Sequence, residues 1–359
     1  MWYKITPNDT LFFRDGKPFT MGADTWADTL FPPYPSTLYG AIRSWLIFEK
    51  GNLKDFNNGK LKAELGTHSE KGTLGIKGPF LIKDELYFPT PKDLVYPKSN
   101  ETYLYKLSLI KRPEFVISDY RLEKLFVWQR NELVDDANYF VSSVYLKDYL
   151  TNCSKIKFVE KSQLFSSENK TGIARERLLL TTKKSHLYRI PMVRLQKDVS
   201  LVLKIEGVID LPESGVIQLG GEGKSAKIEL LQEDILGDLL NINLQNNGKI
   251  FKIYFATPTI FEKGWLPKWI DTDTLKGNYN GIQLKLISAC IGNHKFIGGW
   301  DVKFNKPKPM RKSVPAGSVY YFEILDDNDQ EKIKQAFHFK NISDINSDEG
   351  FGLTFVGSV

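Results

Sequence analysis

The first fifty residues show a pattern of apolar and polar positions that predicts a strand, a long polar loop and a helix. Residues 2–5 form a short apolar run typical of a strand. A proline-rich approach at 32–35 precedes Ser36 and Thr37, which are residue types preferred at the N-cap of a helix. Apolar side chains then recur at helical spacing, at Leu38, Ile42, Trp45 and Leu46. We therefore expect a helix whose backward extension the prolines prevent.

Beyond residue 50 the pattern changes to short strands with few helices. Residues 51–78 are polar and punctuated by glycines, which indicates an exposed insertion. The pattern predicts a hairpin at 81–88, a short helical or irregular segment at 139–150, strands at 201–209, 227–231 and 250–256, and helices at 282–289 and 330–337. The fold class is therefore α+β rather than a doubly wound sheet. A shift from basic loop to regular strands predicts two domains, 1–200 and 201–359.

The composition is that of a globular protein and excludes several classes of protein. Apolar residues make up 42% of the chain and charged residues 26%. No window reaches the roughly 18 uninterrupted apolar residues that a membrane span requires. The first ten residues lack the layout of a secretory signal, and Cys153 and Cys290 are far apart. Since the four histidines are also scattered, we expect a cytoplasmic protein without disulfides, a metal or another cofactor.

Positive charge is concentrated in two stretches, although the formal net charge is only +6. Residues 170–197 contain eight basic residues and one acid, and residues 303–312 contain five basic residues and no acid. A hairpin with one positive face at 170–197 would bind along an RNA backbone, with a salt-dependent affinity. The alternative is a solvated loop whose charges keep the protein soluble.

Three glycine-containing motifs are candidates for contact with nucleic acid. Residues 220–224 (GGEGK) lack the spacing of a nucleotide-hydrolase phosphate loop, but their backbone and Lys224 suit a phosphate. Residues 298–300 (GGW) and 350–352 (GFG) pair glycine with an aromatic residue, which suits a stacked base. The alternative for each motif is a turn between strands, with the aromatic rings of Trp300 and Phe351 packed in the core.

The predicted helix start is a further candidate phosphate site, because the N-terminus of a helix presents unpaired N–H groups. Arg14, Lys17 and Arg43 lie near it in the sequence. An ordinary N-cap without a ligand explains Ser36 equally well. An alternative function is an acid–base ribonuclease that uses His186 with Lys183 or Tyr188. A surface histidine is the simpler interpretation of His186, because efficient cleavage needs a second positioned group.

In their order along the chain, several motifs resemble one family. These are LFFRDGKPF at 11–19, PPYPSTLYGAIR at 32–43, LGGEGK at 219–224, ATP at 256–258 with GW at 264–265, IGGWD at 297–301, VPAGSVYYF at 314–322, and GFG at 350–352 with Gly357. Together they are similar to the subunit-three family of the Cmr complex, a type III-B CRISPR effector. This family belongs to the Cas-five group of the RAMP superfamily.

The resemblance implies tandem ferredoxin-like (RRM-like) modules with insertions and a protruding basic β-hairpin at 170–197. It implies a non-catalytic subunit that caps the 5′ handle of the guide RNA (crRNA) in antiviral defence. The implied partners are the large polymerase-type Cmr subunit two and the backbone Cmr subunit four. The alternatives are a metal-independent endoribonuclease of the same superfamily, which processes guide-RNA precursors, and a scaffold whose basic patches meet acidic proteins.

The residues that we expect to contact RNA come from all of these segments. They are Arg14, Lys17, Ser36, Thr37, Arg43, Thr171, Gly172, Ile173, Arg175, Arg177, Lys183, Lys184, Arg189, Gly220, Gly221, Gly223, Lys224, Gly298, Gly299, Trp300, Arg311, Lys312, Gly350, Phe351 and Gly352.

Overall fold

The computed structural model describes residues 1–14, 29–99, 102–176, 181–244, 249–301, 303–326 and 330–359, with the backbone alone described for 182–187. The chain divides into two compact units. The first contains Met1–Lys83, Lys161–Glu233 and Phe296–Arg311, and the second contains Asp84–Glu160, Asp234–Lys295 and Lys312–Val359. The expected boundary at residue 200 falls inside the first unit, because the strand that begins at Ser200 pairs with the strand that begins at Trp2.

Among its described residues, the first unit holds three α-helices, one 3-10 helix and a set of longer strands. Its elements are β1 (Trp2–Pro7), α1 (Pro35–Lys50), α2 (Leu53–Asn57), α3 (Lys62–Leu65), β2 (Gly75–Ile82), the 3-10 helix η1 (Lys161–Gln163), β11 (Phe165–Arg175), β12 (Thr182–Leu195), β13 (Ser200–Glu206), β14 (Ser214–Gln218), β15 (Ser225–Leu231), β20 (Trp300–Asp301) and β21 (Lys306–Pro307). At its borders with the second unit lie β19 (Lys295–Ile297) and β22 (Arg311–Ser313).

The second unit is rich in short strands. Its elements are β3 (Leu86–Pro89), β4 (Leu94–Pro97), β5 (Tyr103–Lys106), β6 (Ser108–Lys111), β7 (Lys124–Val127), β8 (Val134–Asp136), β9 (Phe140–Ser142), α4 (Ser143–Leu150), β10 (Lys155–Lys157), η2 (Gly237–Leu239), β16 (Ile250–Phe255), β17 (Lys276–Tyr279), β18 (Ile282–Cys290), β23 (Val319–Ile324), α5 (Gln330–Phe337), β24 (Lys340–Asn341), η3 (Ser347–Glu349) and β25 (Leu353–Ser358). The α+β class predicted from the sequence is thereby confirmed.

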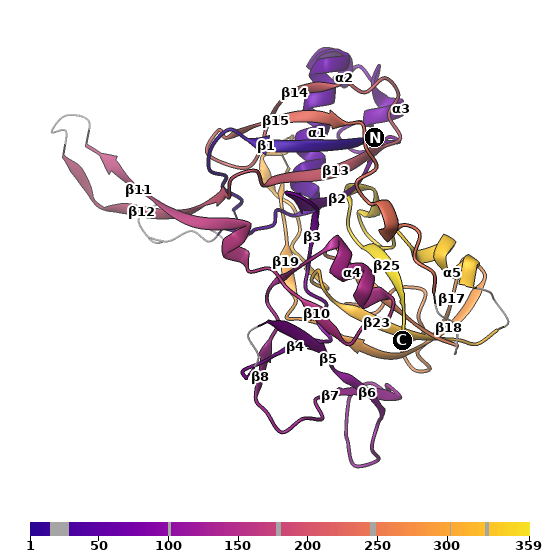
Figure 1. The fold of residues 1–359 in the computed structure, drawn as a ribbon. Coiled ribbons are helices and arrows are strands. Elements are labelled where there is room, and N and C mark those ends of the chain that lie inside the picture. Colours follow the sequence, from indigo (N-terminus) through magenta and orange to yellow (C-terminus); the bar gives the residue numbers. More distant parts are fainter. Residues whose placement is uncertain (15–28, 100–101, 177–180, 245–248, 302, 327–329) are drawn as a thin grey trace. The chain divides into compact units, whose positions relative to one another are not determined.

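The strands of the first unit form an antiparallel sheet in the order β14-β15-β1-β13-β2, with α1 packed against β14 and β2 (Figure 1). The predicted helix is confirmed, and its apolar stripe is the face that it buries. The ring of Trp45 meets Tyr3 of β1 edge to face, with 6.0 Å between the ring centroids. In the part of the chain that the structure describes, no helix is long and apolar enough to cross a membrane.

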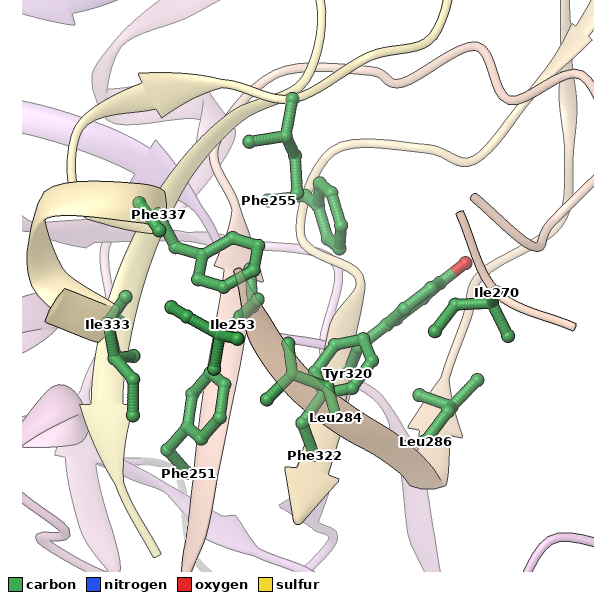
Figure 2. Close-up of a cluster of buried hydrophobic side chains, with 14 of the residues drawn as sticks. Phe251, Ile253, Phe255, Ile270, Leu284, Leu286, Tyr320, Phe322, Ile333 and Phe337 are labelled. Atoms are coloured by element: carbon green, nitrogen blue, oxygen red, sulfur yellow. The ribbon is translucent and has the colours of Figure 1, made fainter. Parts of the chain in front are cut away.

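The second unit contains a larger antiparallel sheet in the order β17-β18-β23-β16-β25-β24. Figure 2 shows its core, in which aromatic and aliphatic side chains from β16, β18 and β23 meet the apolar side of α5. The rings of Phe251 and Phe322 stack with 5.9 Å between their centroids, and Phe337 of α5 stacks on Tyr279 at 4.7 Å. Burial of each phenylalanine contributes roughly 2–3 kcal/mol.

Two segments differ from the sequence-based expectation. The helix predicted at 282–289 is wrong, because this segment is β18. Ile282, Leu284 and Leu286 are buried while Gln283 is exposed, so the alternation of a strand prevails over the helical spacing. The insertion at 51–78 is not merely an exposed loop, since it forms α2 and α3 and enters β2 at Gly75.

A buried polar network lies in the second unit. Asp93 accepts hydrogen bonds from the hydroxyl groups of Tyr149, at 2.8 Å to each carboxylate oxygen, and of Tyr321, at 2.6 Å, and all three residues are fully buried. Lys252, also fully buried, donates to the backbone carbonyl of Tyr149 at 2.7 Å. Burial lowers the pKa of Lys252 well below its usual value, with the charge of Lys106 acting in the same direction and that of Asp93 opposing it. The carboxylate of Asp93 is thus the acceptor for both tyrosine hydroxyl groups, and its charge favours the protonated form of Lys252.

Candidate nucleic-acid interface

The basic stretch at 170–197 folds mainly into a long β-hairpin. Strands β11 and β12 pair antiparallel from Phe165↔Leu195 to Ile173↔Leu187, and after an irregularity Arg175 pairs with Thr182. At about 3.3 Å per residue, the eleven residues of β11 span roughly 35 Å. Figure 1 shows the hairpin extending away from the sheet of its own unit. The predicted hairpin is therefore confirmed.

The base of the hairpin is fixed by the segment that follows β1. Leu11 and Val193 exchange two backbone hydrogen bonds of 2.8 Å. Phe12 forms a small buried cluster with Ile190 and Met192 of β12. A hairpin anchored by both backbone and apolar contacts holds its outer half in a defined direction.

The outer half of the hairpin presents polar and basic groups. Thr171 lies directly opposite Arg189, so both side chains lie on one face, and both are exposed. Arg175 and Ile173 are exposed as well. Within the described chain no carboxylate forms an ion pair with Arg175 or Arg189, which leaves two guanidinium groups available for phosphates.

Gly172 serves packing within the hairpin. The ring of Tyr188, directly opposite on β12, occupies the space that a Cβ at this position would need. The ring of Tyr188 therefore covers this side of Gly172, a residue that we expected to contact RNA.

Acidic side chains neutralise the basic residues near the base of the hairpin. The ammonium nitrogen of Lys170 lies 3.4 Å from a carboxylate oxygen of Glu222. Guanidinium nitrogens of Arg194 lie 2.5 Å from a carboxylate oxygen of Glu168 and 3.4 Å from one of Asp9. The positive charge available to a ligand is therefore concentrated toward the outer half, rather than spread over the whole stretch as the sequence suggested.

The glycine cluster at 220–224 is a tight turn between β14 and β15. The N–H of Gly221 donates to the carbonyl of Phe12 at 2.8 Å, and Gly220 leaves no room for a Cβ against that same carbonyl. Lys224 lies 2.5 Å from Asp9, so its charge is already paired. Gly223 has open space around it. The turn interpretation is confirmed, and the expected free cation at Lys224 is corrected to an ion pair.

Asp9 joins the turn and the hairpin, since it accepts from both Lys224 and Arg194. The hydrogen bond from Lys224, followed by that from the backbone of Thr10, lowers the pKa of Asp9 to about 2. A carboxylate with a depressed pKa stabilises the folded state above its unfolded value of 3.8, and this contribution disappears as the pH falls through about 2.

We therefore expect Asp9→Asn to be less stable than the wild-type chain at pH 5 to 7 but equally stable near pH 2. Urea unfolding of both proteins across this range measures the difference, and Asp84→Asn serves as the control for removal of an exposed carboxylate. A difference that stays constant down to pH 2 would show that the Asp9 ion pairs do not stabilise the fold.

The start of α1 differs from the expectation in two ways. The N-cap is Tyr34 and the helix begins at Pro35, so neither Ser36 nor Thr37 caps it. Arg43 is not directed at a ligand, because its guanidinium donates to the carbonyl groups of Leu65, at 2.7 Å, and of Thr67. Arg43 therefore links α1 to the end of α3 and to the segment that follows it. Arg14 is exposed and pairs through its backbone with Thr29.

The two glycine–aromatic motifs have opposite environments. Phe351 is fully buried and the backbone of its loop is used internally, since Gly350 accepts from Thr257 and Gly352 donates to Pro258. Gly350, Phe351 and Gly352 are thus part of the second unit's packing, not a stacking site. Trp300, by contrast, is 54% exposed in the first unit. Gly298 and Gly299 directly precede Trp300 in the chain, and Arg311 and Lys312 are exposed in β22.

Several predicted residues cannot be placed. Lys17 and Arg177 lie outside the described residues, and Lys183, Lys184 and His186 lie where the backbone alone is described. Tyr188, the proposed partner of His186, packs against Gly172 and the cluster of Phe12.

Sequence reasoning missed Phe304, which is 60% exposed between two lysines. An aromatic residue within a basic run was the signal that could have found it.

A family model described as CRISPR-associated protein (Cas_Cmr3) matches residues 3–359. The CRISPR system CMR subunit Cmr3 of Saccharolobus solfataricus is 22% identical over 332 residues, which cover 90% of this chain and 86% of that protein.

Solved structures show the same fold. A chain in the cryo-EM structure of the type III-B Cmr-beta bound to cognate target RNA has a TM-score of 0.52 and 18% identity, covering 89% of this chain and 86% of that one. In the structure that also contains AMPPnP, the TM-score is 0.53 and the identity 17%, with the same coverage.

Proposed function

Because the chain belongs to the family of CRISPR-associated proteins described as Cas_Cmr3, we propose that it is an RNA-binding subunit of a type III-B Cmr effector. In this proposal the subunit holds the single-stranded 5′ handle of the guide RNA, does not cut it, and acts in antiviral defence in the cytoplasm. The observation that carries the proposal is the hairpin β11–β12, whose outer half exposes Arg175 and Arg189.

The hairpin suits a single-stranded RNA backbone. Guanidinium groups bind phosphate oxygens in a bidentate manner, and each neutralised phosphate releases a counterion. Exposed Thr171 beside Arg189 adds a hydroxyl group that can donate to phosphate or ribose oxygens. The basic hairpin therefore supplies affinity through the backbone, and discrimination of the handle sequence comes from other contacts.

We propose in addition that each unit is built on a ferredoxin-like module. The strand order supports this. In the first unit β15-β1-β13-β2 follows the 4-1-3-2 order of that fold, with α1 as the crossover between the first two strands. In the second unit β25-β16-β23-β18 follows the same order, with α5 before the last strand.

We propose that the large subunit two and the backbone subunit four bind this chain. A surface suited to a protein partner is the loop between β6 and β7, where Phe115 is 84% and Ile117 is 97% exposed. Large apolar side chains displayed together in this way are typical of protein contacts.

The proposal is tested by binding of the full-length chain, with and without the large subunit, to guide RNAs that carry the native or a scrambled 5′ handle. We expect tighter binding to the native handle and intact RNA on a denaturing gel. Equal affinity for both handles would contradict handle recognition. Fresh cleavage products that disappear in His186→Ala would instead favour the endoribonuclease.

A further inference from the structure

The segment from Gly298 to Lys312, here called the finger, forms a turn in its described residues (298–301 and 303–312), and all of these except Lys312 belong to the first unit. Strands β20 and β21 pair as Trp300↔Pro307 and Asp301↔Lys306, and the N–H of Lys308 donates to the carbonyl of Gly299 at 2.9 Å. The carboxylate of Asp301 accepts from the N–H of Phe304 at 3.0 Å and so fixes the position of that residue. The tip of the finger is therefore held by its own hydrogen bonds.

Two aromatic rings on this finger are exposed to solvent. Trp300 is 54% exposed, Phe304 is 60% exposed, and Met310 beyond them is 46% exposed. Aromatic residues this exposed and this close in the chain lose the free energy of burial that the core would give them. Their exposure indicates a binding surface rather than a packing role.

The cations of the finger adjoin these rings. The ammonium groups of Lys303 and Lys306 each lie 5.4 Å from the ring centroid of Phe304. Lys308, Arg311 and Lys312 follow, and within the described chain none of these five cations forms an ion pair with a carboxylate. Asp301 is the one acid between 298 and 312, and it is used by the Phe304 N–H.

Exposed aromatic faces beside unpaired cations fit a single-stranded nucleic acid. A base stacks on the ring, and the flexible lysines move from the ring face to the flanking phosphates. An acidic peptide would use the cations but would leave the rings without a partner of matching shape. Gly298 and Gly299 have no side chains to obstruct a base next to Trp300.

We infer that the finger is a base-stacking site, in which Trp300 and Phe304 hold unpaired bases of single-stranded RNA while Lys303 and Lys306 neutralise the adjacent phosphates. This rests on the proposed function, since it takes RNA as the ligand. It assigns to the finger a role that is not proposed for the hairpin β11–β12, namely the binding of base faces in addition to phosphates.

The test uses the full-length chain with a short oligouridine RNA and with the same RNA made abasic. In the double variant Trp300→Leu, Phe304→Leu we expect roughly tenfold or greater loss of affinity for the intact RNA, because stacking on each ring is lost. The slope of affinity against salt stays unchanged, since no charge is removed. On abasic RNA the variant and the wild type bind equally. Phe48→Leu, at a phenylalanine of α1 that is 62% exposed, is the matched control.

Three results would overturn the inference: undiminished binding of intact RNA by the double variant, a loss that persists on abasic RNA, or a flattened salt slope. A wild-type chain that does not distinguish intact from abasic RNA overturns it without any variant. The oligouridine carries no handle, so the result can be interpreted even if the protein does not recognise the handle. Conversely, unchanged RNA affinity in the double variant would contradict only the stacking role inferred for the finger.

Discussion

Reversal of charge at the outer half of the hairpin, by Arg175→Glu together with Arg189→Glu, is expected to weaken binding of guide RNA roughly 10- to 100-fold near physiological salt. Both side chains are exposed and unpaired within the described chain, so their removal leaves no buried charge behind. Since each contact with a single-strand phosphate contributes about 0.7 to the slope of log affinity against log salt, loss of two contacts lowers the slope by about 1.4. Titrations at several salt concentrations measure both quantities.

Two control proteins make this result specific. Arg175→Lys with Arg189→Lys keeps the charge, so the salt slope is expected to remain while some affinity is lost with the bidentate geometry. Lys268→Glu with Lys276→Glu makes the same change of net charge at two exposed positions of the second unit. Should the control pair and the hairpin pair weaken binding equally, the hairpin would act through net charge alone and would not be the contact surface.

Replacement of the buried carboxylate in Asp93→Ala is expected to lower the free energy of unfolding by roughly 3–5 kcal/mol. The hydroxyl groups of Tyr149 and Tyr321 lose their acceptor, and Lys252 loses the charge that offsets its burial. Urea unfolding measures the change. Asp84→Ala, at an exposed carboxylate in the turn after β2, is expected to stay within about 0.5 kcal/mol of wild type.

A double variant separates the two contributions. If the cost arises from the uncompensated lysine, Asp93→Ala with Lys252→Met destabilises the protein by less than the sum of the single changes. Strict additivity would mean that the tyrosine hydroxyl groups carry the whole effect, and a loss below about 1 kcal/mol in Asp93→Ala would remove the network as a source of stability.

Local patterns predicted local structure well. The stripe Leu38, Ile42 and Trp45 identified α1, and the density of Arg and Lys after residue 170 identified the hairpin as the basic element. Where period-two and helical spacing coincided, as in β18, the pattern alone favoured the wrong element. Both the correct and the incorrect predictions rest on the residue types and their spacing within a single segment.

Contacts between residues that are far apart in the chain could not be predicted from such local patterns. Asp9 and Lys224 are 215 residues apart in the chain, so no local pattern reveals that they neutralise each other. The motifs around Trp300 and Phe351 look alike, yet one ring is exposed and the other is buried in a different unit. The long-range fold decides which cations remain available for RNA. The sequence analysis therefore named Lys224 and Arg43, whose side chains have partners within the fold, together with the exposed Arg175 and Arg189.

The interleaved units have a consequence for how the protein is made. Strand β1 has its partners at β13 and β15, about 200 residues further along, so at 5–20 residues per second a ribosome leaves it unpaired for roughly 10–40 s. During that time the chain passes through Asp84–Glu160, which belongs to the other unit. A fragment that ends at residue 200 keeps β1 and β2 but lacks β14, β15 and nearly all of β13, so β1 has neither of its neighbours in the sheet.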